Sequence, residues 1–239
     1  MLRLDRWLVT LGVGSRSEVQ KLVKKGGVKV NDAPVKNPGM QVDENTARLT
    51  VNGAPMDGRL TRHVMLHKPA GLLTAARDKK QPTVMDLLPE VYASIGCMPV
   101  GRLDKDTTGL LFLTTDGELN HRLLSPGRHV DKTYLAEVDG TLNASHIVAF
   151  AEGLHLSDFD AQPARLEIFA PHLGRVTVHE GKFHQVKRMF SAVGCEVVKL
   201  HRETFGSLTL DPNLPEGEWR ELTEDELSAL YSDAQMEVK

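Results

Sequence analysis

The chain has 239 residues, of which 41% are hydrophobic and 26% are charged, and its formal net charge is −3. This composition is typical of a globular protein with one large domain or two unequal domains, and no apolar run approaches the roughly 20 residues of a membrane-spanning helix. The two cysteines, Cys97 and Cys195, lie far apart and outside any CxxC pattern, and the N-terminus lacks the apolar core of a secretory signal, so we expect a cytoplasmic protein with reduced thiols and no membrane association.

Positive charge is concentrated at the N-terminus. Residues 1–36 carry a net charge of +5, whereas the remainder carries −8. A small basic module joined to a larger acidic body favours binding of a polyanion, although a solvated basic helix face explains the charge equally well. The candidate contact residues are Arg3, Arg6, Arg16, Lys21, Lys24, Lys25 and Lys29.

The first predicted elements form a compact module. Apolar residues at i, i+3, i+4 and i+7 predict an amphipathic helix over residues 4–11. Ser15 and Glu18 form a capping box, which predicts a second helix that ends at the glycine pair 26–27. A short strand and a turn follow up to about residue 35. Residues 51–61 are polar and rich in turn formers, so they predict a linker.

Strands and helices mix without a regular βαβ repeat after this linker. Helices are predicted up to about residue 124 and over residues 182–193, and strands over 64–66, 110–114, 132–138, 164–169 and 174–179. This order predicts an α+β fold with a largely antiparallel sheet. Residues 232–239 predict a flexible tail.

A charged loop, residues 101–109, runs directly into the apolar run that begins at Leu110. Its two carboxylates, Asp104 and Asp106, are either turn formers or groups held at the edge of a cleft. Lys187 lies at the border of the apolar stripe of the helix predicted at 182–193, either as a snorkelling side chain or as the cation that keeps a carboxylate ionised. Tyr134 is either a core residue or a platform for a nucleobase.

Together these segments resemble a known set of motifs. Residues 101–110 (GRLDKDTTGL), 132–134 (KTY) and 180–190 (EGKFHQVKRMF) look like the signature motifs of the RNA pseudouridine synthases, and 68–71 (KPAG) is similar to a further motif. Residues 3–8, 15–18 and 26–31 resemble an S4 domain, an RNA-binding module. The combination is most similar to the small-subunit ribosomal branch, the RsuA type. His67 departs from the asparagine usual in the family, and we expect it to affect local hydrogen bonding only.

The resemblance implies an architecture and a set of roles. An S4 (αL-like) domain at residues 1–50 would precede the linker and a two-lobed, mainly antiparallel catalytic domain at 62–231. Asp104 matches the catalytic nucleophile, Tyr134 the tyrosine that stacks on the flipped base, and Lys187 the basic partner of the aspartate. Asp106 would only shape the loop. Further RNA contacts would come from Arg102, Lys182 and Arg188.

The implied reaction converts a uridine of ribosomal RNA to pseudouridine, most specifically uridine 516 of 16S rRNA. It loses no atom, so no cofactor or metal is expected, and we expect a monomer whose partner is ribosomal RNA or the assembling small subunit. The residues leave open whether Asp104 attacks the base, attacks the ribose or promotes elimination. A 23S rRNA target, or a non-catalytic RNA-binding factor in ribosome assembly, remains an alternative.

Overall fold

The computed structural model describes residues 1–237 and divides into two compact units. The first comprises residues 1–62 together with 88–97, and the second comprises residues 63–87 and 98 onward. No helix within residues 1–237 is long and apolar enough to cross a bilayer.

The first unit contains three helices and small antiparallel sheets. Its elements are β1 (Leu2–Arg3), α1 (Leu4–Thr10), α2 (Arg16–Lys24), β2 (Val28–Val30), β3 (Ala33–Pro34), β4 (Gln41–Val42), β5 (Leu49–Val51), β6 (Ala54–Met56) and α3 (Glu90–Ser94). Both halves of the predicted capping box at Ser15 and Glu18 are present at the start of α2. The apolar faces of α1 and α2 pack around the fully buried Trp7. The predicted helices and the first strand are therefore confirmed.

The predicted linker needs correction at its beginning. Residues 49–56 form a hairpin, because β5 pairs with both β2 and β6. The indole of Trp7 also donates a hydrogen bond of 2.8 Å to the carbonyl of Gly58. The turn formers at Asn52 and Gly53, both at positive φ, thus close a tight hairpin turn rather than mark a free connection.

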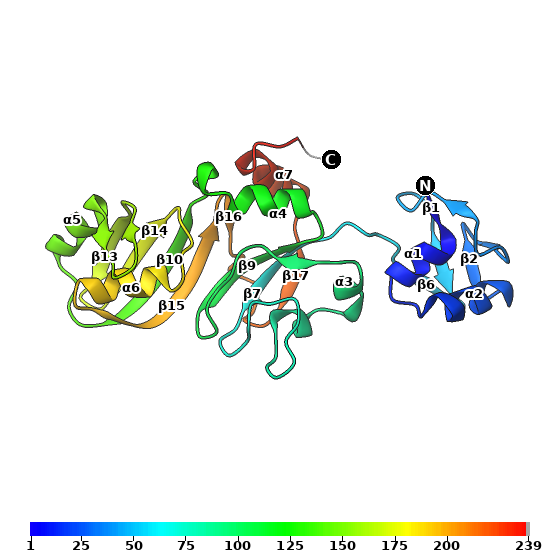
Figure 1. Ribbon diagram of the computed structural model, residues 1–239, viewed down its shortest axis with the longest axis horizontal. Coiled ribbons are helices and arrows are strands. Elements are labelled where there is room, and N and C mark those ends of the chain that lie inside the picture. Colours follow the sequence, from blue (N-terminus) through cyan, green and yellow to red (C-terminus); the bar gives the residue numbers. More distant parts are fainter. Residues whose placement is uncertain (238–239) are drawn as a thin grey trace. The chain divides into compact units, whose positions relative to one another are not determined.

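The second unit is built on one nine-stranded sheet with the order β13-β14-β10-β15-β9-β7-β17 (Figure 1). All its pairings are antiparallel except β15 with β9, which confirms the prediction of a mainly antiparallel sheet. The strands of the path are β7 (His63–Lys68), β9 (Thr108–Thr114), β10 (Lys132–Asp139), β13 (Arg165–Ala170), β14 (Leu173–Val178), β15 (Glu196–Phe205) and β17 (Trp219–Glu221). The other two strands of the nine are β8 (Met98–Pro99), which pairs with β9, and β16 (Leu208–Thr209), which pairs with β15. The strands β11 (Leu154–His155) and β12 (Asp160–Ala161) form a separate two-stranded sheet.

Helices cover this sheet in two groups (Figure 1). One group, α4 (Gly117–Leu124) and α7 (Glu224–Asp233), packs with β7 and β9 around Phe112, Leu119 and Leu230. The other group, α5 (Ala144–Glu152) and α6 (Gln185–Ala192), contacts β13 and β15 respectively. Two 3-10 turns complete the unit, η1 (Val84–Leu87) and η2 (Pro126–Arg128).

The C-terminal segment differs from the predicted flexible tail. The helix α7 continues to Asp233, Ala234 is fully buried, and Met236 packs against the core. The last two residues of the predicted tail, 238–239, lie outside the described part. The apolar side chains of Ala234 and Met236 pack against the core, so residues 232–236 do not form a free tail.

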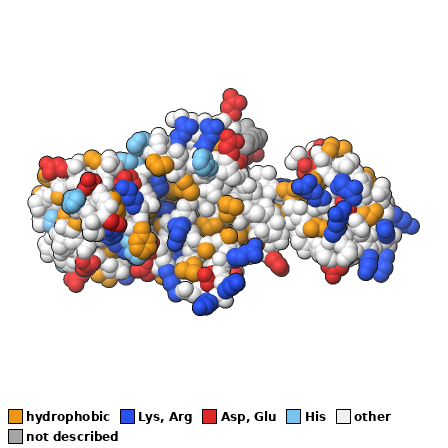
Figure 2. All heavy atoms as spheres, viewed as in Figure 1, with side chains coloured by type: hydrophobic (Ala, Val, Ile, Leu, Met, Phe, Trp, Pro, Cys, Tyr) orange, Lys and Arg blue, Asp and Glu red, His pale blue; other side chains and the backbone are white. Residues whose placement is uncertain are grey.

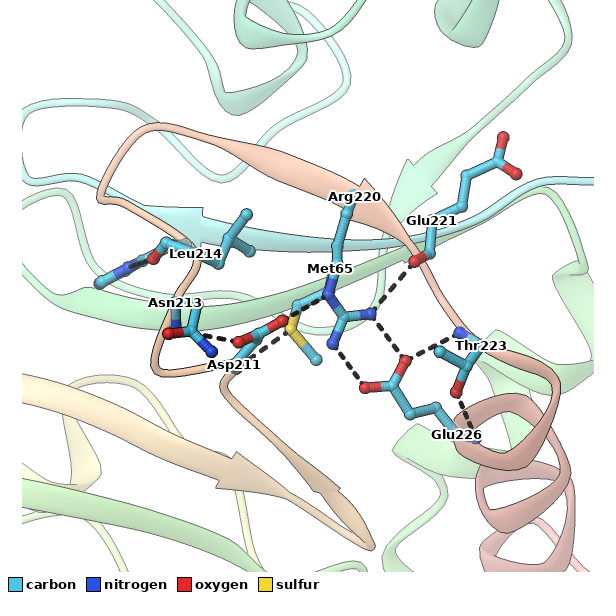
Figure 3. A network of polar contacts seen from close by, with 9 residues as sticks. Met65, Asp211, Asn213, Leu214, Arg220, Glu221, Thr223 and Glu226 are labelled. Atoms are coloured by element: carbon cyan, nitrogen blue, oxygen red, sulfur yellow. Dashed lines mark hydrogen bonds and ion pairs between the residues drawn. The ribbon is translucent and has the colours of Figure 1, made fainter.

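An arginine ties the last helix to the sheet (Figure 3). Arg220 on β17 donates to the carboxylate of Asp211 at 2.9 Å and to both oxygens of Glu226 at 2.8 and 2.7 Å. Glu226 also accepts from the backbone of Thr223 at 2.8 Å, which completes a second capping box. These bonds lower the pKa of Glu226 and raise that of Arg220, in each case mainly through the hydrogen bond between the two side chains.

Candidate active site

The loop of residues 101–107 precedes β9 and is fixed by a close approach of two strands. A Cβ on Gly109 would lie 2.3 Å from the carbonyl oxygen of Arg202, and Gly109 has a φ of +104°. Only glycine allows this approach. It brings β9 beside β15 in the single parallel pairing of the sheet and so places the loop next to the central strands.

Buried polar groups hold the same loop from the other side. The ammonium of Lys68, fully buried, donates to the carbonyls of Thr107 at 2.9 Å, Pro69 at 3.0 Å and Lys105 at 3.3 Å. Burial lowers the pKa of Lys68 to about 8. The hydroxyl of Thr74 donates to the carbonyl of Leu103 at 2.8 Å and accepts from its backbone N–H at 3.2 Å. The segment that resembles the KPAG motif therefore supports the loop backbone.

Asp104 lies at the edge of a small cavity, with its side chain 27% exposed. Two cationic or ionisable groups face its carboxylate: Nζ of Lys187 lies 3.6 Å from one oxygen and Nε2 of His184 lies 3.5 Å from the other. The predicted proximity of Lys187 to Asp104 is therefore present in the structure. The arrangement leaves the carboxylate partly open to a ligand, with an ammonium on one side of it and an imidazole on the other.

Asp106 has a larger part in this arrangement than a loop-shaping residue. Its carboxylate accepts a 2.6 Å hydrogen bond from Lys187, so the ammonium sits closer to Asp106 than to Asp104. This hydrogen bond is the main cause of the lowered pKa of Asp106. A single ammonium therefore lies between both carboxylates, a contact that the expected loop-shaping role of Asp106 did not include.

Tyr134 lies on β10 and lines the same cavity, together with Arg102, Asp104, Lys182 and Lys187. The cavity has a volume of about 70 Å³, and its apolar wall consists of Leu103, Val178, Val186 and Leu200. Tyr134 is only 8% exposed. The structure thus joins side chains from three sequence segments that lie 30 or more residues apart, and it gives a carboxylate, a cation and an aromatic ring access to one enclosed space.

The segment before α6 differs from the prediction. The helix begins at Gln185 rather than at residue 182, because His184 adopts a left-handed conformation with φ +49°. Helical spacing over 182–193 would place Phe183 on the apolar stripe with Val186 and Phe190, but Phe183 is 72% exposed and stacks on the ring of His184. The buried Gln185 accepts from the backbone of Lys182 at 3.0 Å and donates to Glu180 at 2.8 Å, which fixes the turn.

The predicted RNA contacts in the second unit have different surroundings. Arg102 is exposed and lines the cavity. Arg188 instead pairs with Asp158 and packs 4.8 Å from the centre of the Phe159 ring, and the ammonium of Lys182 lies 4.2 Å from the same ring centre. Lys182 lines the cavity, whereas Arg188 does not.

The basic residues predicted to contact RNA in the first unit are exposed (Figure 2). Arg3 is held in an ion pair of 2.8 Å with the buried Asp5. The other predicted contacts form no ion pair with any residue in the range 1–237, namely Arg6, Arg16, Lys21, Lys24, Lys25 and Lys29. These charged side chains are exposed at the surface, where a polyanion can reach them.

Comparison with known proteins decides the family. Residues 62–192 match the RNA pseudouridylate synthase family, and residues 2–47 match the S4 domain. The chain belongs to the RNA pseudouridylate synthase family. It is 44% identical over 234 residues to an uncharacterised RNA pseudouridine synthase, YtzG, of Bacillus subtilis, with 96% of this chain and 98% of the relative covered.

Further relatives carry a more specific name. A ribosomal small subunit pseudouridine synthase A of Pseudomonas aeruginosa is 41% identical over 239 residues, with 96% of this chain and the whole relative covered. A solved structure described as a pseudouridylate synthase superposes with a TM-score of 0.68 at 36% identity, over 96% of this chain and all of that chain. The resemblance inferred from the motifs, including the S4 domain, is therefore confirmed.

Two residues of the site had no individual role assigned from the sequence, His184 beside Asp104 and the buried Lys68, and the contact of Asp106 with Lys187 was not predicted. The sequence around Lys68 gives no local sign that its side chain is buried. The sequence around His184 likewise gives no sign of its left-handed conformation. The Nδ1–H of His67 donates to the carbonyl of Leu214 at 2.8 Å, and the His67 ring lies 5.4 Å from that of His201. It therefore contacts structure behind the loop rather than the cavity.

Proposed function

We propose that this pseudouridine synthase isomerises a specific uridine of ribosomal RNA, with uridine 516 of 16S rRNA as the target. The observation that carries the proposal is the cavity that Asp104, Tyr134 and Lys187 share. The names of relatives such as that of Pseudomonas aeruginosa, a ribosomal small subunit pseudouridine synthase A, support the choice of RNA.

The reaction breaks the N1–C1′ bond of uridine, turns the uracil, and forms a C5–C1′ bond. In the proposed mechanism Asp104 is the nucleophile, and each of its possible routes requires an ionised carboxylate. Lys187 supplies positive charge 3.6 Å from that carboxylate, which favours its charged form in a partly enclosed space. The ammonium therefore has a direct electrostatic reason to be there, and the imidazole of His184 lies 3.5 Å from the other oxygen of Asp104.

The target uridine must leave its stack before its reacting atoms are accessible. Tyr134 offers an aromatic ring on which the flipped base stacks, and it assists a later proton transfer. Arg102, exposed at the cavity rim, contacts the RNA backbone during flipping. The free cations of the S4 domain anchor the RNA outside the cavity.

To test this function, the purified protein is incubated with a 16S rRNA transcript, and pseudouridine is mapped by carbodiimide modification and primer extension. The wild-type chain is expected to form one pseudouridine, at position 516. Asp104→Asn is expected to lose roughly a thousandfold or more of this activity while it retains RNA binding. Asp139→Asn, at the exposed end of β10, is the matched control and should stay fully active. Activity retained by Asp104→Asn contradicts the proposed role.

A further inference from the structure

A second, larger cleft adjoins the cavity at Asp104. It has a volume of about 820 Å³ and shares Arg102, Asp104 and Tyr134 with the small cavity. Two further cations, Lys132 and Arg202, line it together with Phe205. The proposed reaction assigns no role to either of them.

Both cations are almost completely removed from water. Arg202 is 1% exposed and Lys132 is 8% exposed. They come from the neighbouring central strands β15 and β10, where Lys132 pairs with Phe205 and Tyr134 pairs with Arg202. The Nζ of Lys132 and the Cζ of Arg202 each lie 5.3 Å from the centre of the Phe205 ring. The sheet therefore holds two like charges close together beneath the cleft.

The positive charge of this pair is not compensated by an ion pair with any carboxylate of the described residues. Lys132 donates to the carbonyl of Val130 at 2.5 Å and Arg202 to the carbonyl of Leu110 at 2.7 Å, and neither forms an ion pair within residues 1–237. The Nη2 atom of Arg202 is buried without a hydrogen-bond partner in the same range. The acid that acts electrostatically on Lys132 is its chain neighbour Asp131, and this attraction is weaker than the combined effect of burial and Arg202, which lower the pKa of Lys132 to about 8.

Buried cations without counter-ions are costly, so an anion that reaches such a group gains a favourable interaction. Elsewhere in this unit the half-buried Arg175 and Arg220 each have a carboxylate partner, and the fully buried Lys68 donates to three backbone carbonyls. The pair that faces the cleft beside the proposed nucleophile differs from these, because it has no carboxylate partner among the described residues and Nη2 of Arg202 has no hydrogen bond there. Its missing counter-ion is therefore expected from the ligand.

We propose that Lys132 and Arg202 form an anion site for the phosphodiester that flanks the flipped uridine, an inference that rests on the proposed function. Lys132 and Tyr134 lie two residues apart on the same face of β10, a spacing of about 7 Å along a strand. This separation has the size of one nucleotide, so one strand holds both the stacked base and the phosphate beside it. Lys132 donates a hydrogen bond to the phosphate, and the positive charge of the more deeply buried Arg202 attracts the same phosphate.

Binding across a salt series tests the site without any measurement of turnover. The RNA is a 16S fragment that contains the proposed target. Lys132→Gln is expected to weaken binding about tenfold at low salt and to reduce the slope of log K against log salt by about 0.7. Lys199→Gln is the matched control, because Lys199 is an exposed lysine of β15 that pairs with Glu137. Its affinity and slope should equal those of the wild type.

Single methylphosphonate linkages, which are neutral, identify the phosphate. On the wild type and on Lys199→Gln, the substitution next to the target uridine is expected to weaken binding about tenfold. On Lys132→Gln the same substitution should cause no further loss, because both changes remove one contact. Fully additive losses at both flanking linkages overturn the proposal. Pseudouridine formation by the wild type on the same fragment is measured in parallel, so a failed target assignment is recognised separately.

The wild-type protein supplies a test that does not depend on a variant. The ammonium of Lys132 is titrated by NMR with the fragment and, separately, with inorganic phosphate. A pKa that rises well above 8 with the RNA supports the site, whereas no change with the RNA contradicts it. A pKa that rises with inorganic phosphate but not with the RNA also overturns the proposal, because the site then binds free phosphate and not the RNA backbone.

Discussion

The two units of the chain present positive charge in opposite ways. In the S4 unit, cations such as Lys21 and Lys25 are exposed and unpaired within the described residues. In the catalytic unit, Lys187 lies between two carboxylates, Lys68 is fully buried against backbone carbonyls, and Lys132 lies beneath a cleft. Exposed, unpaired charges contribute affinity that salt screens easily, whereas charges held by neighbouring groups can position a ligand. We therefore propose that the S4 unit binds the RNA and that the catalytic unit positions a single nucleotide.

The largest expected effect in this comparison comes from removing a fixed cation. Lys187→Met leaves Asp104 and Asp106 without their shared ammonium, so the turnover rate should fall about thirtyfold to a hundredfold. RNA affinity should change little. Lys187→Arg restores the charge and should recover part of the rate in single-turnover assays. An equal loss of affinity and rate in Lys187→Met would show that fixed and free cations act alike.

The free cations of α2 should show the reverse pattern. Replacing Lys21, Lys24 and Lys25 together by Gln preserves helix propensity and removes three exposed charges. RNA affinity at low salt should fall about tenfold, with a shallower salt dependence. The rate at saturating RNA should stay within about twofold of the wild type. Equilibrium binding and single-turnover kinetics on one RNA separate the two quantities, and an unchanged salt slope argues against RNA anchoring by this helix.

A smaller effect distinguishes the two carboxylates that share Lys187. Asp106→Asn removes the closer partner of the ammonium, 2.6 Å away, and leaves Lys187 to face Asp104 alone. The rate should change by less than about fivefold, because a cation remains beside the nucleophile. Asp104→Asn, measured in the same single-turnover assay, provides the contrast. A loss as large as that of Asp104→Asn would assign Asp106 a direct chemical role.

The smallest expected effect concerns stability. The hydrogen bond from Arg220 lowers the pKa of Glu226, so ionised Glu226 stabilises the fold above the pKa of an unfolded glutamate, about 4.3. This contribution is lost as the pH falls through the lower pKa of the folded state. Glu226→Gln should cost about 1 kcal/mol at pH 7 and make urea unfolding less sensitive to pH below about 4.5. Identical pH profiles for the variant and the wild type would contradict this.

Local signals in the sequence predicted the S4 unit well, because its elements are set by neighbours in the chain. The capping box at Ser15 and the apolar spacing of α1 required no distant contact. The catalytic site was predictable only as a set of motifs. The bridging of Asp104 and Asp106 by Lys187 depends on where β9 meets β15, which Gly109 allows. The exposure of Phe183 was missed because helical periodicity gives no sign that the left-handed His184 delays the start of the helix to Gln185.

The most direct test of the central claim maps pseudouridine across ribosomal RNA from a strain that lacks this protein. The account predicts one missing pseudouridine, at position 516 of 16S rRNA. The wild-type gene should restore it, whereas a gene that encodes Asp104→Asn should not. A complete pseudouridine map in the deletion strain, or restoration of the missing site by Asp104→Asn, would contradict the account.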